Sequence, residues 1–432
     1  MAFEKNFCPS PWFHMRINNS GTYEYCRWRA GTGGTRVDFS HNIRHQTPTE
    51  YFQQELAPLR QALLNGEAPP GCSGCYIMEQ HNKVSGRQRQ LLKVGIQEQY
   101  FEKSLSSTTL KSAFDYSNNN QGLTDRTVTD WQIDLGNYCN GACVYCGPES
   151  SSRLATEFQK LGLIDQIPPP AWCDDPELVD QFVQVLASSP ALQYLHFIGG
   201  ETLITPGFKT ILSALVDAGV AKDITVGFTT NLTVWSDDIV DLLKQFCQVH
   251  LGMSVETLTP INDYVRYPSR RAQTQELLDR WVNLGQQHDW LIQLRITPTC
   301  LTVHELHTVY DYAWQNNIAV ESCNFIDNPK FMRISVLPQA HRLVAIQTLK
   351  AWVQDHQTTS DQQIINTRDP HIAQTQIVQD AQSYLNYLTS VEDESHRLPD
   401  LIKFLKTLES NRGNSILTYL PQYEELFRSA GY

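Results

Sequence analysis

The sequence predicts an α/β protein built on a parallel sheet, because strand-like segments alternate with helical ones over the middle of the chain. Six segments have the alternation or the apolar content of strands, and they lie at 131–135, 192–198, 224–228, 249–255, 291–296 and, more weakly, 319–325. Helical segments lie between them, at 176–187, 207–218, 236–247, 271–286 and 303–315. Repeated strand–helix units form a parallel sheet with helices outside it. Functional side chains in such sheets gather at the carboxyl ends of the strands.

The residues on either side of this α/β part predict two further regions. The first 100 residues carry four cysteines on short, irregular elements, among them a hairpin over 15–26 and a helix over 49–65. Residues 117–127 are polar without periodicity, which is typical of a linker. Residues 339–432 are mostly helical, polar and rich in glutamine, with no cofactor motif. We therefore divide the chain into regions 1–115, 128–335 and 339–432.

Composition limits the classes of function. The chain has 432 residues, 41% of them apolar, and carries 34 basic against 46 acidic side chains, a net charge of −12. A chain of this length has room for about two to three domains. Its acidic balance disfavours nucleic-acid or anionic-membrane partners. No apolar run approaches the roughly 20 residues of a membrane span, and the first residues lack a signal-peptide segment. We expect a cytoplasmic protein that binds neither nucleic acid nor membrane.

Three of the eleven cysteines, Cys139, Cys143 and Cys146, form a C-x3-C-x2-C group directly after the first strand of the α/β part. In a cytoplasmic chain they are expected to be thiols rather than disulfides. Soft thiolates select zinc, copper(I) or iron–sulfur clusters. Structural zinc takes four ligands, and no His or Cys follows closely. A four-iron cluster held by three cysteines keeps one iron open for another ligand. The group therefore predicts a reactive site.

Together with Tyr145 and with Gly199-Gly200-Glu201 at the end of the second strand, the triplet resembles the radical S-adenosylmethionine (SAM) superfamily. The resemblance covers about residues 128–335 and implies a partial (β/α)6 barrel. It also implies a [4Fe-4S] cluster on the three cysteines, with SAM chelated at the open iron. An external reducing electron donor would then allow cleavage of SAM to a 5′-deoxyadenosyl radical, which abstracts hydrogen from a substrate.

Further residues near the strand ends are expected to contact SAM. Gly199 and Gly200 would allow close approach to its methionyl group, and Glu201 would accept hydrogen bonds from its ammonium group. The other candidates are Thr230, Asn231, Ser254, Glu256 and Arg266. Arg266 would pair with the SAM carboxylate in a bidentate manner. For Asn231, Ser254 and Glu256 the alternative is a solvated or structural role, and for Arg266 it is a surface ion pair.

The N-terminal cysteines Cys8, Cys26, Cys72 and Cys75 form a second group. Cys8 and Cys26 flank Gly21, and Cys72-Ser-Gly-Cys75 is a C-x2-C element. This pattern resembles SPASM or twitch domains, which hold auxiliary iron–sulfur clusters, and here it precedes the barrel. Four cysteines would saturate one auxiliary [4Fe-4S] cluster, which favours electron relay or structural support. A four-cysteine zinc site has the same ligand count.

Radical SAM enzymes with an auxiliary cluster most often modify peptides. The resemblance therefore implies a maturase for a ribosomally synthesised precursor peptide. Leader recognition would need either a small partner protein or the helical C-terminal tail. Excision of tyramine as in spliceases, crosslinking and epimerisation stay open; for epimerisation, Cys300 or Cys323 is a candidate hydrogen donor. One alternative is a radical SAM dehydrogenase or other enzyme acting on a small molecule. A second is a non-catalytic zinc or iron–sulfur binding protein.

Overall fold

The computed structural model describes residues 6–26, 41–80, 85–96, 107–322, 326, 328–356 and 370–432. One eight-stranded sheet runs through this part of the chain, in the order β2-β1-β3-β4-β5-β6-β7-β8. The strands are β1 (His14–Ile17), β2 (Tyr23–Glu24), β3 (Asp130–Asp134), β4 (Tyr194–Ile198), β5 (Thr225–Thr230), β6 (Gln248–Ser254), β7 (Leu291–Arg295) and β8 (Ala319–Glu321). Only β1 and β2 pair in antiparallel fashion; every other neighbouring pair is parallel. The expected α/β class, with six parallel strands β3–β8, is confirmed.

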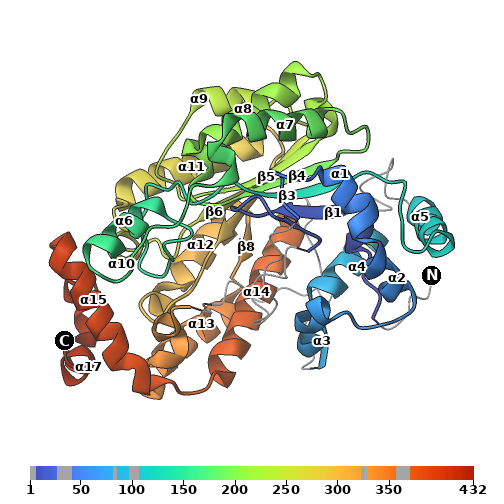
Figure 1. Ribbon diagram of the computed structural model, residues 1–432. Coiled ribbons are helices and arrows are strands. Elements are labelled where there is room, and N and C mark those ends of the chain that lie inside the picture. Colours follow the sequence, from blue (N-terminus) through green and yellow to red (C-terminus); the bar gives the residue numbers. More distant parts are fainter. Residues whose placement is uncertain are drawn as a thin grey trace.

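Helices connect the parallel strands and cover the sheet (Figure 1). Those of the α/β part are α6 (Ser152–Lys160), α7 (Pro176–Ala187), α8 (Pro206–Asp217), α9 (Asp237–Leu243), α10 (Ile261–Val265), α11 (Arg271–Gln287) and α12 (His307–Asn316). The five expected helices are confirmed as α7, α8, α9, α11 and α12, with ends that differ by up to four residues. The short helices α6 and α10 were not expected.

Alternation along the strands gives the sheet one apolar and one polar face. Trp131 of β3 packs edge-on against Phe182 of α7, with ring centroids 5.0 Å apart, and Phe197 of β4 packs likewise against Phe208 of α8, at 4.9 Å. These apolar side chains lie in the core between sheet and helices. Gln132 and other residues one position away point to the opposite face, because successive strand residues alternate. The inner face of the sheet is therefore polar and available for a site.

The N-terminal hairpin extends this sheet. Ile17 pairs with Tyr23 across the expected turn, and Met15 lies beside Trp131 in the parallel pairing of β1 with β3. The hairpin is thus confirmed, and its place at the edge of the main sheet is a new finding. Residues 117–119, expected in a linker, instead end the helix α5.

Helices make up most of the rest of the N-terminal region. They are α1 (Pro48–Glu50), the π-helix η2 (Tyr51–Glu55), α2 (Ala57–Leu64), α3 (Ser73–Gln80), α4 (Gly86–Ile96) and α5 (Ser107–Asn119). The expected helix over 49–65 is present as α1, η2 and α2. The buried Arg60 of α2 donates to the carbonyls of Pro11, at 2.9 Å, and Gly122, at 3.3 Å. Burial lowers the pKa of Arg60 to about 9, and these carbonyls satisfy its guanidinium group.

The C-terminal region is helical, as expected. It contains α13 (Gln339–Asp355), α14 (Pro370–Ser390), α15 (Leu398–Arg412), α16 (Ile416–Tyr419) and α17 (Glu424–Ser429). Helix α14 closes the edge of the sheet at β8. The Gln376 amide accepts from Val320 N at 3.1 Å and donates to Val320 O at 2.7 Å, so it replaces a neighbouring strand. A bare strand edge invites pairing with other chains, and this contact blocks it.

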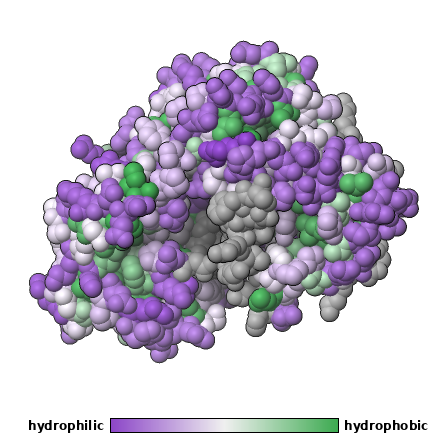
Figure 2. Space-filling view, in the orientation of Figure 1, coloured by the Kyte–Doolittle hydropathy of each residue, from purple (hydrophilic) through white to green (hydrophobic). Residues whose placement is uncertain are grey.

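The outer surface is mainly hydrophilic on the side shown in Figure 2, where apolar side chains form only small patches. In the part of the chain that the structure describes, no helix combines the length and the apolar character that crossing a membrane requires.

Candidate functional site

The cysteine triplet lies on the loop between β3 and α6. Ala142 N donates to Tyr267 O at 2.7 Å and Val144 N donates to Val265 O at 2.9 Å, so the loop runs along the segment that follows α10. On its other side, the hydroxyl of Ser151, the N-cap of α6, donates to Gly141 O at 2.5 Å. These bonds hold the backbone of the loop on both sides and leave its three thiols grouped at the carboxyl end of β3.

The three cysteines are partly buried. Burial raises the pKa of Cys139 to about 11 and that of Cys146 to about 12, and it also raises the pKa of Cys143. Thiols must lose their protons to bind metal, so a bound group has to supply strong positive charge here. No group of three or more His, Cys, Asp or Glu side chains within the described residues is arranged to hold a single metal ion. A four-iron cluster binds each thiolate to a different iron, and the three cysteines fit such a group.

Gly199 and Gly200 bring the end of β4 against this loop. Gly200 N donates to Gly136 O at 2.8 Å. A Cβ on Gly200 would lie 2.2 Å from Tyr138 O, and one on Gly199, where φ is +136°, would lie 2.6 Å from Gly136 O. Both contacts are with backbone, which cannot move aside cheaply. Both glycines thus make room for the cysteine loop, and the contact with SAM expected of them stays a prediction.

Glu201 joins the ends of β4 and β5. Its carboxylate accepts from Leu203 N at 3.2 Å, from the Thr230 hydroxyl at 2.9 Å and from Asn231 N at 2.6 Å. Burial raises its pKa to about 7, against the effect of these bonds. A carboxylate has about four acceptor positions, so one remains for a further donor such as an ammonium group. Thr230 therefore supports Glu201 from within the protein.

Asn231 faces the cysteine loop. Its amide donates to Asn140 Oδ1 at 2.9 Å and lies 3.9 Å from Cys139 Sγ. Its side-chain oxygen accepts from Thr233 N at 3.1 Å. The structure thus brings together the ends of β3 and β5, as expected from their parallel arrangement.

Arg266 forms a buried cluster with Glu256 and Tyr145. Its Nη1 lies 2.7 Å from Glu256 Oε1 and 2.5 Å from the Tyr145 hydroxyl, which itself donates to Glu256 Oε1 at 2.5 Å. Arg266 is only 8% exposed and Glu256 only 1%. The surface ion pair considered for Arg266 is therefore wrong. These contacts use Nη1 of the guanidinium group, so a bidentate bond from Nε and Nη2 to a SAM carboxylate stays a prediction.

The charges of this cluster act on the triplet. Burial raises the pKa of Glu256, and Arg266 opposes that shift. Burial would lower the pKa of Arg266, but Tyr145, Cys143 and Glu256 together raise it above its usual value. Arg266 therefore stays charged, and its positive charge favours the thiolate form of Cys143.

Ser254 ends β6 on the polar inner face, partly exposed and beside Arg295 of β7 in register. Arg295 donates to the Thr229 hydroxyl at 3.2 Å and pairs with Glu321 at 3.1 Å. It lies over Gly252, where a Cβ would meet its Cδ at 2.7 Å. We did not predict a role for Arg295 or Glu321, although their alternation with apolar neighbours would have placed them on the inner face.

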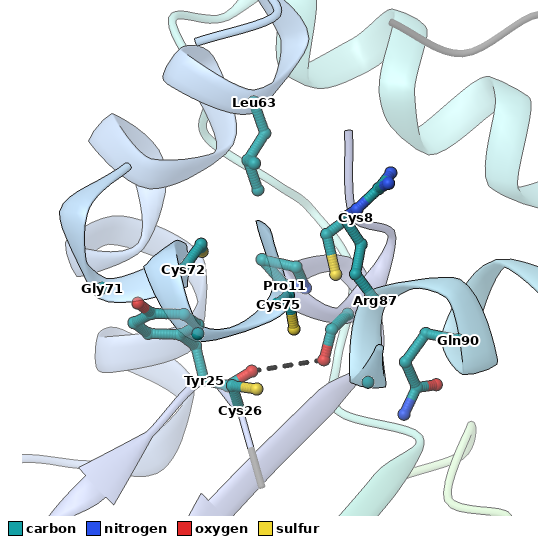
Figure 3. A pocket seen from close by; sticks show the side chains of 13 residues that line it. Cys8, Pro11, Tyr25, Cys26, Leu63, Gly71, Cys72, Cys75, Arg87 and Gln90 are labelled. Atoms are coloured by element: carbon teal, nitrogen blue, oxygen red, sulfur yellow. Dashed lines mark hydrogen bonds between the residues drawn. The ribbon is translucent and has the colours of Figure 1, made fainter. Parts of the chain in front are cut away.

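The four N-terminal cysteines surround one pocket (Figure 3). Burial and the neighbouring thiols of Cys26, Cys72 and Cys75 raise the pKa of Cys8 well above its usual value. Four thiols around one pocket are a donor set for either a [4Fe-4S] cluster or a four-cysteine zinc site.

A polar network supports this pocket. Arg87, on its wall, pairs with Glu79 through two hydrogen bonds, at 2.5 and 3.0 Å, and donates to Phe7 O at 2.9 Å beside Cys8. The Ser85 hydroxyl also donates to Glu79. Glu79, Ser85 and Arg87 thus connect α3 and α4, which hold two walls of the pocket.

Cys300, a candidate hydrogen donor, is fully buried, and its carbonyl accepts from the Tyr423 hydroxyl at 3.5 Å. Burial raises its pKa. This position is that of a core thiol. Cys323, the other candidate, lies outside the described residues.

Fold and site together define an α/β protein with a three-thiol loop at the carboxyl end of the first strand of a (β/α)6 array. The sequence profile of the radical SAM superfamily matches residues 133–301, a span that includes the triplet and Gly199–Glu201. Residues 133–301 therefore carry the sequence pattern of the radical SAM superfamily, whose members use a [4Fe-4S] cluster and SAM.

Known proteins resemble parts of the chain. GTP 3′,8-cyclase from Streptomyces coelicolor is 25% identical over 154 residues, which are 36% of this chain and 40% of the relative. SuiB from Streptococcus suis bound to its precursor peptide SuiA is 12% identical, with a TM-score of 0.38 over 68% of this chain and 62% of SuiB. The enzyme anSMEcpe with bound AdoMet is 16% identical, with a TM-score of 0.37 over 52% of this chain and 60% of its own. The chain spans less than two thirds of each of these proteins.

Proposed function

We propose that this radical SAM enzyme modifies a peptide, with Cys139, Cys143 and Cys146 as the ligands of its catalytic [4Fe-4S] cluster. When bound, cluster and SAM supply a 5′-deoxyadenosyl radical that can remove hydrogen from an unactivated C–H bond. The residues of the chain bind, orient and shield these groups. The remaining acceptor position of Glu201 suits the ammonium group of SAM, and Ser254 offers a hydroxyl from β6.

The proposal of a peptide substrate rests on one row of the inner face. Glu24, Arg16 and Gln132 lie side by side on β2, β1 and β3. Arg16 makes only long ion pairs, at 3.4 Å, with Glu24 and Asp134. Within the described residues, the buried Arg16 Nε and the buried Gln132 Oε1 have no hydrogen-bond partner.

An unpaired donor beside an unpaired acceptor matches an amide, which offers both a C=O and an N–H. Buried polar groups without partners are costly, so a ligand that satisfies both atoms is favoured. This chemistry supports a peptide over an aliphatic small molecule. Glu24 lies two residues before Cys26, and Asp134 ends the strand that leads to Cys139. The row and its ion-pair partner Asp134 are therefore close in sequence to both groups of cysteines.

We also propose that the N-terminal cysteines hold an auxiliary [4Fe-4S] cluster that relays electrons or supports the substrate site. The burial of Cys8 among three further thiols supports this assignment. A precursor peptide, an electron donor and a small partner protein for leader recognition complete the proposed set of partners. Among the reactions, tyramine excision, crosslinking and epimerisation all begin with hydrogen abstraction.

Mass spectrometry distinguishes these reactions. The protein is reconstituted anaerobically with iron and sulfide and is given SAM, reductant and candidate precursor peptides. Loss of a tyramine unit indicates a splicease, loss of two hydrogens indicates crosslinking, and unchanged mass with an inverted residue indicates epimerisation. SAM cleavage without any change in every peptide tested would contradict the proposed substrate class.

A substitution in the inner row tests the site. Gln132→Leu removes the free acceptor, and we expect KM for the peptide to rise about 3- to 10-fold, the value of one hydrogen bond. Peptide-independent SAM cleavage should stay unchanged. Gln245→Leu, in the exposed turn that follows α9, is the matched control. An unchanged KM for Gln132→Leu would contradict the role of this row.

The similarity to a GTP 3′,8-cyclase favours a nucleotide as the second candidate substrate. Incubation of the reconstituted enzyme with GTP, followed by chromatography of the nucleotides, tests it. A new guanine-derived product at a rate above that of uncoupled SAM cleavage would support the nucleotide and exclude the peptide.

A further inference from the structure

We infer that the C-terminal helix α15 is part of the cluster-binding machinery, because Arg412 holds the backbone of the cysteine loop in place. The inference rests on the proposed function only in assigning the cluster to that loop. Arg412 and the triplet are far apart in sequence and meet only in the fold, where α15 packs beside the loop.

Arg412 contacts the loop directly. Its Nη2 donates to Ala142 O at 2.8 Å, and the same guanidinium group forms two bonds with Glu157 of α6, at 2.6 and 2.9 Å. The Arg412 side chain is only 2% exposed and that of Glu157 only 8%. Ala142 immediately precedes Cys143. The contact therefore fixes the peptide group next to the central cysteine of the triplet.

The Ala142 residue is held from both sides. Its N–H donates to Tyr267 O at 2.7 Å, while its C=O accepts from Arg412. The Arg412 guanidinium carbon also lies 4.6 Å from the centre of the Tyr267 ring, a cation–π contact. The planar guanidinium group of Arg412 thus forms a bidentate ion pair with Glu157, donates to the carbonyl of Ala142 and stacks on the ring of Tyr267. Lysine cannot reproduce this geometry.

The end of α15 is built to place Arg412. The helix stops at this residue, and Gly413 follows in the left-handed region at φ +68°. A positive side chain at a helix C-terminus is favoured by the helix dipole. Asn411 donates to Glu157 Oε1 at 2.9 Å and so orients the carboxylate that holds Arg412.

A second contact from α15 reaches the segment behind the loop. Glu409, one turn before Arg412, accepts from the Tyr264 hydroxyl at 2.8 Å. It also accepts from Ile416 N at 2.6 Å and from the Tyr432 hydroxyl at 2.8 Å. Tyr264 lies on α10, two residues before Arg266. Helix α15 therefore holds both the cysteine loop and the segment against which the loop lies.

Arg412 also contributes charge. Its guanidinium group is bonded to the peptide group next to Cys143, through the 2.8 Å contact with Ala142 O. A buried positive charge near a cluster favours the more negative, reduced state. Loss of the Arg412 charge should therefore move the midpoint potential of the cluster to a more negative value.

Amide hydrogen exchange of the cluster-free chain tests the positioning role. In Arg412→Met we expect the segment 139–146 to exchange about 10-fold faster or more, since hydrogen bonds to charged groups stabilise by about 1.5–3 kcal/mol. Arg428→Met, at an exposed pair on α17, is the control and should leave this segment unchanged. If Arg412→Met leaves exchange in this segment the same as the control does, the inference is wrong.

Two further variants separate positioning from charge and from misfolding. Arg412→Lys should restore the midpoint potential of the reconstituted cluster but not the slow exchange of the loop. In Arg412→Met the buried Glu157 carboxylate loses its partner, which by itself destabilises the fold. The double variant with Glu157→Gln removes that charge, so fast amide exchange of segment 139–146 in the double variant reports the lost contact with Ala142 O. An unchanged loop in the double variant would overturn the inference. A wild-type chain that binds no iron would instead contradict the cluster assignment, while the difference in exchange would persist.

Discussion

The buried cluster of Glu256, Arg266 and Tyr145 gives a quantitative test of how the cysteine loop is supported. Glu256→Gln keeps the shape of the side chain and removes its charge. In the wild type this carboxylate accepts from Arg266 at 2.7 Å, from Tyr145 at 2.5 Å and from Thr297 N at 2.5 Å. With both ionic groups below 10% exposure, solvent cannot replace the lost partner.

Removing one partner of a buried ion pair destabilises a protein by about 3–5 kcal/mol. Glutamine retains an acceptor oxygen for Thr297 N. We therefore expect Glu256→Gln to lower the free energy of unfolding by about 3 kcal/mol, the lower end of that range. Arg266→Met should cost a similar free energy, because it leaves the Glu256 carboxylate unpaired. The double variant, Glu256→Gln with Arg266→Met, leaves neither charge of this pair. Its loss of unfolding free energy should be at least about 2 kcal/mol smaller than the sum of the losses in the two single variants.

The assay is urea unfolding of the cluster-free chain, followed by tryptophan fluorescence. Tyr145→Phe is the matched control, since it removes one hydroxyl from the same cluster and should cost about 1 kcal/mol. Additive losses in the double variant would refute the assignment of this pair as a coupled buried unit.

Three other changes have defined outcomes. Gly200→Ala places a methyl group against a carbonyl of the cysteine loop, so the anaerobically reconstituted variant should bind less iron than wild type. Gly207→Ala is the control, because its added methyl group meets its neighbours at ordinary contact distances and should leave the bound iron unchanged. Equal amounts of iron in the two variants would contradict the role of Gly200. Burial and His341 lower the folded-state pKa of His304 to about 4. In the unfolded chain this histidine has its ordinary pKa of about 6.5, so below that pH the unfolded chain binds more protons than the folded one. The free energy of unfolding should therefore fall as pH drops from about 6.5 to about 4. His304→Gln should flatten this dependence in urea unfolding, and an unchanged slope would contradict it. Gln376→Leu should cost about 1–3 kcal/mol of unfolding free energy, because both polar groups of a β8 residue lose their partner; a loss no larger than for an exposed glutamine would argue against edge capping.

Local patterns in the sequence were sufficient to predict the strand–helix order and the two groups of cysteines. Helix α7 begins and ends where expected, since Asp175 caps it, Pro176 opens it, and its apolar residues recur with helical spacing. The triplet is conspicuous because its chemistry needs closely spaced thiols. The parallel order then brings Glu201 and Asn231 to the same edge of the sheet.

Contacts between distant segments could not be predicted from such patterns. The pairing of β1 with β3 joins Met15 to Trp131, and a four-residue strand carries no signal of its partner. Arg412 meets Ala142 across 270 residues. The burial of Arg266 depends on α10, a helix of five residues that is too short to show periodicity. These are the contacts that turn a recognisable set of cysteines into a supported loop.

Cys139, Cys143 and Cys146 are proposed to hold the cluster at which SAM is cleaved. The most direct measurement of this role is the formation of 5′-deoxyadenosine from SAM by the anaerobically reconstituted, reduced protein, compared with Cys143→Ala and Cys72→Ala. We predict cleavage by wild type, none by Cys143→Ala, and retained cleavage with less total iron in Cys72→Ala. Cleavage that persists in Cys143→Ala, or a wild type that binds only zinc and leaves SAM intact, would contradict the account.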